Sequence, residues 1–299
     1  MATAIPSHDP FAPSGPTLPT AIADIGSLDH KDRQEALTKS VEDAFERLAE
    51  QLNQGYTDDY FQFLRFYQSF HQYSWTNALL IMIQKPQAHY AASFKHWKKL
   101  GYKIKPGSKA AWIWVPMFRK EKDPDTGIER EVLSGFRDGG VFGDCDLEGL
   151  DEKPLPRLWK PLPDDRGELL AGYVERLKTI GIDVQFRQLA PTLGGFATAG
   201  GTSIVINSLS DSQNALMTLT HELTHCLLHF DTDHPVPEHE IEADAEACSF
   251  VIAGILGIDY RTSADYLLSK KVTAESLKAS LGRVQKATRT IVRMLDIAL

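Results

Sequence analysis

The sequence predicts an α+β protein of two domains. Its 299 residues are enough for two compact units, and 42% hydrophobic and 24% charged residues are typical of a globular chain. The net charge is −8, yet residues 60–120 contain ten lysines and arginines and no acidic residue, which leaves −18 for the rest. An acidic, proline-rich stretch near residues 150–165 follows this basic segment. We therefore expect a flexible, proline-rich tail over residues 1–28, a first domain over 29–163 and a second over 164–299.

Composition argues against several classes of protein. No apolar run approaches the roughly 18 residues of a membrane span, and no basic start followed by an apolar run marks a secretory leader. We therefore expect a cytoplasmic location and no membrane partner. The three cysteines, Cys145, Cys226 and Cys248, form no C-x-x-C pair. The sequence thus predicts neither a disulfide framework nor a thiolate zinc finger.

The first domain begins with a helical pattern over residues 30–52, in which apolar residues recur at Leu37, Val41, Ala44, Phe45, Leu48 and Leu52. A strongly aromatic helical stretch over residues 57–84 follows and should end before Pro86. A short helix, a basic Pro-Gly turn and a strand over 110–115 come next. Residues 119–165 lack such patterns, and we expect loops there.

The second domain should open with a helix over residues 166–181 and a strand over 182–187. Two strand-like segments then flank a turn at Gly200 and Gly201, and the second, Thr202 to Asn207, is expected to be an edge strand that pairs with an extended peptide. Helical patterns complete the chain, from Ser212 onward, over 240–257, and twice within 262–298.

The most informative motif is H-E-x-x-H within TLTHELTHCLLHF. Residues four apart share one helix face, so His221 and His225 can hold one zinc ion, with Glu222 beside them as general base. Leucines on another face, Leu216, Leu219, Leu223 and Leu227, would anchor the helix in a core. The competing interpretation is a helix whose histidines are merely surface or core residues.

A catalytic zinc ion usually takes a third protein ligand and keeps one position open. The candidates lie close downstream: His229, His234, His239, Glu240, Glu242 and Asp244. We favour Glu242, because Glu246 lies four residues further on the same face and could orient a ligand histidine. Glu240 and Asp244 repeat that spacing and remain open alternatives.

The basic segment is also aromatic, with fifteen aromatic residues among the sixty-one of 60–120. A positive groove with aromatic faces suits single-stranded nucleic acid. Its lining is expected to include Lys95, Lys98, Lys99, Lys103, Lys105 and Lys109. An aromatic stripe is also typical of a core, and we expect Phe63, Phe66, Phe70 and Phe94 to be buried.

Residues 73–116 resemble the N-terminal single-stranded-DNA-binding domain of ArdC-type antirestriction proteins, on the stretch NALL, a Trp-x-x-x-Gly step and a Lys-x-Gly turn before a strand. The segment FRDGGVFGDCDLEG resembles a degenerate form of that domain's closing segment, in which Gly143 intervenes and the usual Gln is absent. The resemblance implies an α+β nucleic-acid-binding domain. The DNA contacts expected there are Trp75, Asn77, Lys85, Lys95, Trp97, Lys98, Lys99, Lys103, Lys105 and Lys109.

The segments HELTHCLLH and EADAEACSFVIAGILGI are similar to the metallopeptidase domain of ArdC, related to ImmA/IrrE and Spartan-type peptidases. This similarity implies a zincin-like, gluzincin-type domain with zinc on His221, His225 and Glu242, Glu222 as catalytic base and Glu246 behind the ligands. The family implies protection of incoming plasmid or phage DNA from restriction.

Three hypotheses follow. The first is a single-stranded-DNA-binding zinc metallopeptidase whose substrate is a protein, possibly one bound to DNA. The second is a non-proteolytic coat for single-stranded DNA in which zinc is structural. The third is an ordinary peptidase with a peptide-binding first domain, which would show no salt-dependent affinity for DNA.

Overall fold

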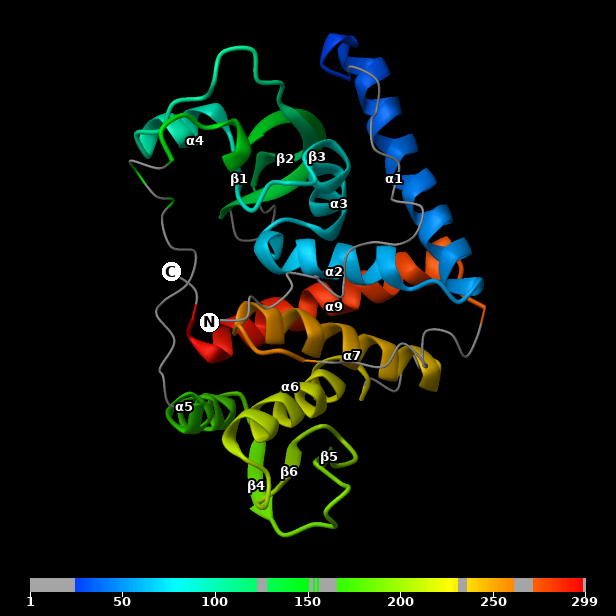
Figure 1. The fold of residues 1–299 in the computed structure, drawn as a ribbon, viewed down its shortest axis with the longest axis vertical. Helices are drawn as coiled ribbons and strands as arrows, with labels where there is room; N and C mark the ends of the chain where they lie inside the picture. The colour runs from blue at the N-terminus through cyan, green and yellow to red at the C-terminus, as the bar shows by residue number, and fades with distance from the viewer. Residues whose placement is uncertain are drawn as a thin grey trace, which may run out of the picture.

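The computed structural model describes residues 25–122, 128–150, 153, 155, 166–230, 236–260 and 271–297. Two small sheets lie at opposite ends of the molecule, with long helices between them (Figure 1). The expected α+β class is confirmed. Residues 1–24 of the predicted tail and the predicted boundary at 163/164 lie outside the described residues.

Three helices open the described chain: α1 (His30–Asn53), α2 (Asp58–Phe70) and α3 (Trp75–Gln84), preceded by the 3-10 helix η1 (Ile25–Ser27). The apolar stripe predicted for α1 is buried. The sequence suggested one aromatic helix up to Pro86, but the structure has two helices, since α2 ends at Phe70 and α3 begins at Trp75. Ser74 caps α3 by accepting the Asn77 N–H at 3.2 Å. The end of α3 before Pro86 is as predicted.

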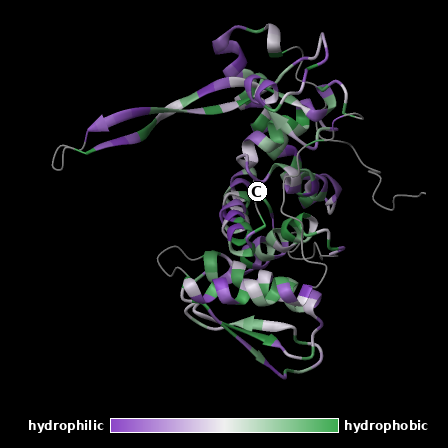
Figure 2. Cartoon of the chain, turned by 90° about the vertical axis from the view of Figure 1, so that its left-hand side faces the viewer, coloured by the Kyte–Doolittle hydropathy of each residue, from purple (hydrophilic) through white to green (hydrophobic). Residues whose placement is uncertain are grey.

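A long hairpin arm follows β1 (Ala91–Ala92) and α4 (Phe94–Lys99). Strands β2 (Ala111–Lys122) and β3 (Glu129–Gly143) pair antiparallel in the sheet order β1-β3-β2, and the arm extends well away from the body (Figure 2). A 3-10 turn, η2 (Asp144–Asp146), ends it. The prediction of loops from residue 119 onward is therefore wrong for residues 119–122 and 129–143. Both faces of the outer arm are exposed, so backbone pairing forms the strands without the apolar alternation that a buried strand shows.

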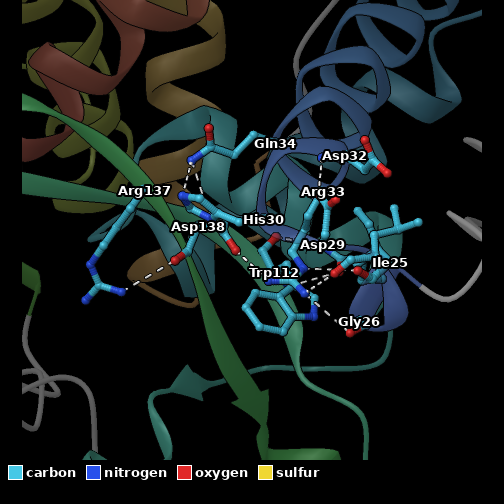
Figure 3. Close-up of polar contacts among 12 residues, drawn as sticks. Ile25, Gly26, Asp29, His30, Asp32, Arg33, Gln34, Trp112, Arg137 and Asp138 are labelled. Carbon is cyan, nitrogen blue, oxygen red and sulfur yellow. Dashed lines mark hydrogen bonds and ion pairs between the residues drawn. The ribbon is translucent and has the colours of Figure 1, made fainter.

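A polar cluster fastens the start of α1 to the base of the arm (Figure 3). The Arg33 guanidinium lies 3.8 Å from the centroid of the Trp112 ring and donates to Asp138 at 2.7 Å. His30 also pairs with Asp138, whose side chain is 3% exposed. Because this carboxylate is buried, its pairing fixes the angle between helix and arm.

The second half contains α5 (Arg166–Thr179), β4 (Asp183–Arg187), β5 (Gly195–Ala197), β6 (Ser203–Asn207), α6 (Ser212–Leu228) and α7 (Glu238–Ile255). The sheet order is β4-β6-β5, with β4 parallel and β5 antiparallel to β6. The prediction that residues 202–207 form an edge strand is wrong. Strand β6 is central and buried, which explains its strongly apolar sequence, and β4 and β5 are the two edges.

The last described helix, α9 (Ala274–Leu295), joins the two halves. Gln285 and Arg289 donate to backbone carbonyls of the loop between α2 and α3, including that of Tyr73 at 2.7 and 3.0 Å. One hydrophobic cluster runs from α1 through α7 to α9, so the halves share a core. The other C-terminal helix expected from the sequence falls within residues 261–270, outside the described residues. Within the described chain, no helix is long and apolar enough to span a membrane.

Candidate metal centre and basic surface

Helix α6 carries the H-E-x-x-H motif with one face in the core. Asp211 caps the helix by accepting the Asn214 N–H at 2.9 Å. Leu216, Leu219 and Leu223 are fully buried, as the sequence predicted. The histidines project from another face, where His221 and His225 side chains are 18% and 12% exposed.

The structure brings His221, His225 and Glu242 together, with one candidate ligand atom from each within 4.8 Å of the others. The two Nε2 atoms lie 3.1 Å apart, and Glu242 oxygens lie 3.5 Å from His221 Nε2 and 3.7 Å from His225 Nε2. Ligands about 2.0–2.1 Å from a tetrahedral ion are about 3.3 Å from each other. These separations and the two-nitrogen, one-carboxylate donor set fit a zinc ion.

The remaining candidates for a third ligand lie elsewhere. Glu240 pairs with Arg283 of α9 at 2.8 Å. Asp244 is fully buried, accepts from Ser280 at 2.6 Å and also pairs with Arg283. His229 contacts Asp244, and His234 lies outside the described residues. His239 is not in the cluster that the described residues form. Within α7, the geometry therefore favours Glu242.

Glu246 lies behind His221, as expected for a residue that orients a ligand. Its Oε1 is 3.7 Å from His221 Nδ1, and its Oε2 accepts a hydrogen bond from the Tyr260 hydroxyl at 3.3 Å. The side chain is thus held between a histidine and a tyrosine. This arrangement suits a carboxylate that fixes the orientation of the ring.

The charges of the centre act differently on its two histidines. Although burial lowers the pKa of His221, its hydrogen bond with Glu242 and the nearby carboxylates raise that pKa overall. Burial and the neighbouring His221 lower the pKa of His225 to about 4. The hydrogen bond from His221 lowers the pKa of Glu242. A neutral imidazole and a carboxylate are the forms that bind a metal ion.

Glu222 stands beside this group and faces the edge strand. Its Oε2 accepts the backbone N–H of Ala197 on β5 at 2.8 Å. Burial is the main cause that raises the pKa of Glu222, and the nearby Glu242 adds to it. A carboxyl group with a raised pKa is suited to accept and return a proton near neutral pH.

Several residues of this region were not found from the sequence. The Ala197 N–H and the Tyr260 hydroxyl carry no motif, because each reaches the site through the fold. His229 was already a candidate ligand from the sequence, since it lies four residues after His225 on the same helix face. Its ring nitrogens instead contact His225 and Asp244 of α7.

The basic surface lies on α4 and the turn after it. The six lysines expected to line a groove are all exposed: Lys95, Lys98, Lys99, Lys103, Lys105 and Lys109. Phe94, expected in the core, is 56% exposed beside them. Its position at the first residue of a short surface helix, with only Phe142 as an aromatic neighbour, explains why it escapes burial.

Other residues expected to contact DNA have structural contacts instead. Trp97 is completely buried, and its indole N–H donates to the Phe142 carbonyl at 2.9 Å, so neither face of the ring is open to a base. Asn77 is bonded through its amide to both backbone groups of Trp114. These two positions belong to the packing of the domain.

Two more of the residues expected to contact DNA, Lys85 and Trp75, already contact other side chains of the protein. Lys85 forms an ion pair with Asp146 at 2.7 Å, and its side chain is 13% exposed. Trp75 is half-buried with its ring edge-on to Phe45, 4.9 Å between centroids. A pocket of about 410 Å³ opens near α4, and Tyr73, Tyr90 and His96 are among its lining residues.

Comparison with known proteins finds a matching family model and similar solved structures. Residues 31–142 match the family model of the N-terminal domain of the anti-restriction factor ArdC. The structure is similar to the metal-free crystal structure of the antirestriction protein ArdC from the R388 plasmid, with a TM-score of 0.52, 18% identity, and coverage of 85% of this chain and 97% of that one. The Mn(II)-bound structure of that protein gives a TM-score of 0.50, 16% identity, and coverage of 84% and 96%.

A curated relative, an uncharacterized protein of Bacillus anthracis, is 22% identical over 286 residues. The match covers 80% of this chain and 48% of the relative, so the chain spans about half the length of that protein. Residues 31–142 thus carry an ArdC-type N-terminal domain, and the similarity to the solved structures shows that the chain shares the ArdC fold.

Proposed function

We propose that this chain is a single-stranded-DNA-binding zinc metallopeptidase, an antirestriction protein that protects incoming plasmid or phage DNA in the cytoplasm. The observation that carries the proposal is the cluster of His221, His225 and Glu242 with Glu222 beside it. The Mn(II)-bound ArdC structure supports a metal ion in a relative. The donor set here favours zinc.

His221, His225 and Glu242 would hold the zinc ion. When bound, zinc would polarise a peptide carbonyl and acidify a water molecule. Glu222 would take the proton from the attacking water and return it to the leaving amine. The Ala197 N–H fixes one oxygen of Glu222, so the other remains directed toward the reacting groups.

Strand β5 offers a place for an extended substrate. Thr198 N–H donates to Ser203 O at 2.8 Å, and Asn207 N–H donates to Gly194 O at 2.7 Å. In an antiparallel pair these bonds alternate, so the backbone groups of Gly195 and the carbonyl of Ala197 face away from β6, while the Ala197 N–H on that side is bonded to Glu222. A peptide added along this edge would lie next to Glu222, which supports a protein substrate.

The DNA-binding part of the proposal rests on the exposed lysines of α4 and its following turn. A phosphate backbone would follow these charges, and the exposed ring of Phe94 would stack on a base. The nearby pocket lined by Tyr73 and Tyr90 adds further aromatic surface. DNA binding and cleavage would thus use separate parts of the molecule, with α4 near one end and α6 and α7 nearer the middle (Figure 1).

The test is a cleavage assay with wild type and Glu222→Gln. Both proteins are loaded with zinc and incubated with and without single-stranded DNA, and self-cleavage and cleavage of DNA-bound proteins are followed. We expect Glu222→Gln to keep zinc and DNA binding and to lose cleavage. Cleavage by the variant at the wild-type rate would refute the peptidase proposal.

A non-proteolytic DNA coat remains the second candidate, favoured by the distance between the basic surface and the metal centre in the fold (Figure 1). It predicts DNA binding with no cleavage by either protein. It also predicts that Glu222→Gln protects incoming DNA from restriction as well as wild type does.

A further inference from the structure

A buried chain of polar side chains lies behind His225, on the side away from Glu242. His225 Nδ1 is 3.3 Å from His229 Nδ1, and His229 Nε2 is 3.2 Å from Asp244 Oδ2. Asp244 in turn accepts from Ser280 at 2.6 Å and pairs with Arg283, both on α9. The His229 side chain is 3% exposed and that of Asp244 is 0%.

For imidazole rings that each carry one proton, the donors and acceptors in this chain can point in only one direction. The Asp244 carboxylate, paired with Arg283, only accepts, so His229 must donate through Nε2. A neutral His229 then has an acceptor at Nδ1, and His225 must donate to it through its own Nδ1. This leaves the lone pair of His225 on Nε2, the atom that lies 3.1 Å from His221 Nε2 and 3.7 Å from Glu242.

We propose that His229 and Asp244 are positioning residues that fix the tautomer and ring orientation of His225 for metal binding, with Arg283 and Ser280 of α9 holding Asp244. The inference rests on the proposed metal centre. It gives His225 a support of a different kind from that of His221, whose Nδ1 faces the carboxylate of Glu246 directly. Both supports run through α7, but only that of His225 continues to α9, through Ser280 and Arg283.

A merely structural role for His229 would require only a side chain that fills the space of its buried ring. The positioning role requires an acceptor toward His225 and a donor toward Asp244. Leucine matches the size of the ring but offers neither group, whereas glutamine offers a carbonyl oxygen and an N–H. The pair His229→Leu and His229→Gln therefore separates the two roles.

The experiment measures the zinc dissociation constant of the full chain by competition with a chelator. Wild type, His229→Leu, His229→Gln and the matched control His239→Ala are compared, because His239 lies on α7 outside the cluster. Loss of an outer partner of a metal ligand typically weakens metal binding about 10- to 100-fold. We expect such a loss in His229→Leu, substantial recovery in His229→Gln and no change in His239→Ala.

A second measurement needs no variant. Nitrogen-15 spectra of histidine-labelled, metal-free wild type should show His225 protonated at Nδ1 and unprotonated at Nε2. The opposite tautomer, or a His229→Leu protein that binds zinc within about twofold of wild type, would overturn the positioning role. Wild type that binds no zinc would instead refute the metal centre, and this inference with it.

Discussion

Salt dependence offers the sharpest test of the basic surface. Six exposed lysines on α4 and the following turn face solvent: Lys95, Lys98, Lys99, Lys103, Lys105 and Lys109. Each phosphate neutralised on a single strand contributes about −0.7 to the slope of log K against log salt, so six contacts give a slope of about −4. Between 50 and 200 mM salt, that slope corresponds to a loss of affinity of roughly 300-fold.

Fluorescence anisotropy with a labelled oligothymidine would measure this slope. Lys98→Gln should make the slope shallower by about 0.7, because one phosphate contact is lost. Lys178→Gln on α5 is the matched control, since this lysine belongs to the other half and pairs with Glu175. A slope near zero for wild type, or equal slopes for wild type and Lys98→Gln, would refute the assignment of DNA binding to α4.

Three further predictions concern stability and catalysis. Arg33→Ala should destabilise the protein by about 1–3 kcal/mol in urea unfolding, because the buried Asp138 loses its guanidinium partner and keeps only His30 and Gln34; an unchanged midpoint would contradict this. Burial lowers the pKa of His71 to about 4, so the folded state binds fewer protons than the unfolded state between there and about pH 6.5. The contribution of His71 to the free energy of unfolding is therefore complete above pH 6.5 and should fall by about 2–3 kcal/mol toward pH 4. Urea unfolding at both pH values should show a smaller fall for His71→Asn. Ala197→Pro removes the N–H that holds Glu222, so cleavage should slow about 10- to 100-fold while the zinc dissociation constant stays unchanged. A loss of zinc affinity as large as the loss of cleavage rate would contradict a role limited to Glu222.

Helical periodicity and the metal motif were readable in the sequence because both depend on local spacing. The apolar stripe of α1 is buried as expected, and so are Leu216, Leu219 and Leu223 of α6, whereas Leu227 is only partly buried. His221 and His225 lie together because residues four apart share a helix face. The resemblance of the first domain to the ArdC N-terminal domain, carried by short local motifs, is confirmed by the family match over residues 31–142.

The hairpin arm and the order of the second sheet could not be read in this way. Strand β3 lacks apolar alternation over its outer part, and only pairing with β2 makes it a strand. Strand β6 was expected at an edge, but sheet order is set by contacts between segments distant along the chain. For the same reason the local pattern of aromatic residues did not reveal that Trp97 is buried and Phe94 is exposed.

By itself, the sequence determined which residues share the metal-facing side of α6 and where a basic segment lies along the chain. Only the tertiary structure decided which carboxylate of α7 joins the two histidines. Arg283 of α9 forms ion pairs with Glu240 and Asp244, whereas Glu242 lies beside the two motif histidines. The pairs Glu240/Asp244 and Glu242/Glu246 have the same four-residue spacing within α7. Which pair faces the histidines therefore depends on the helices that pack against each face of α7.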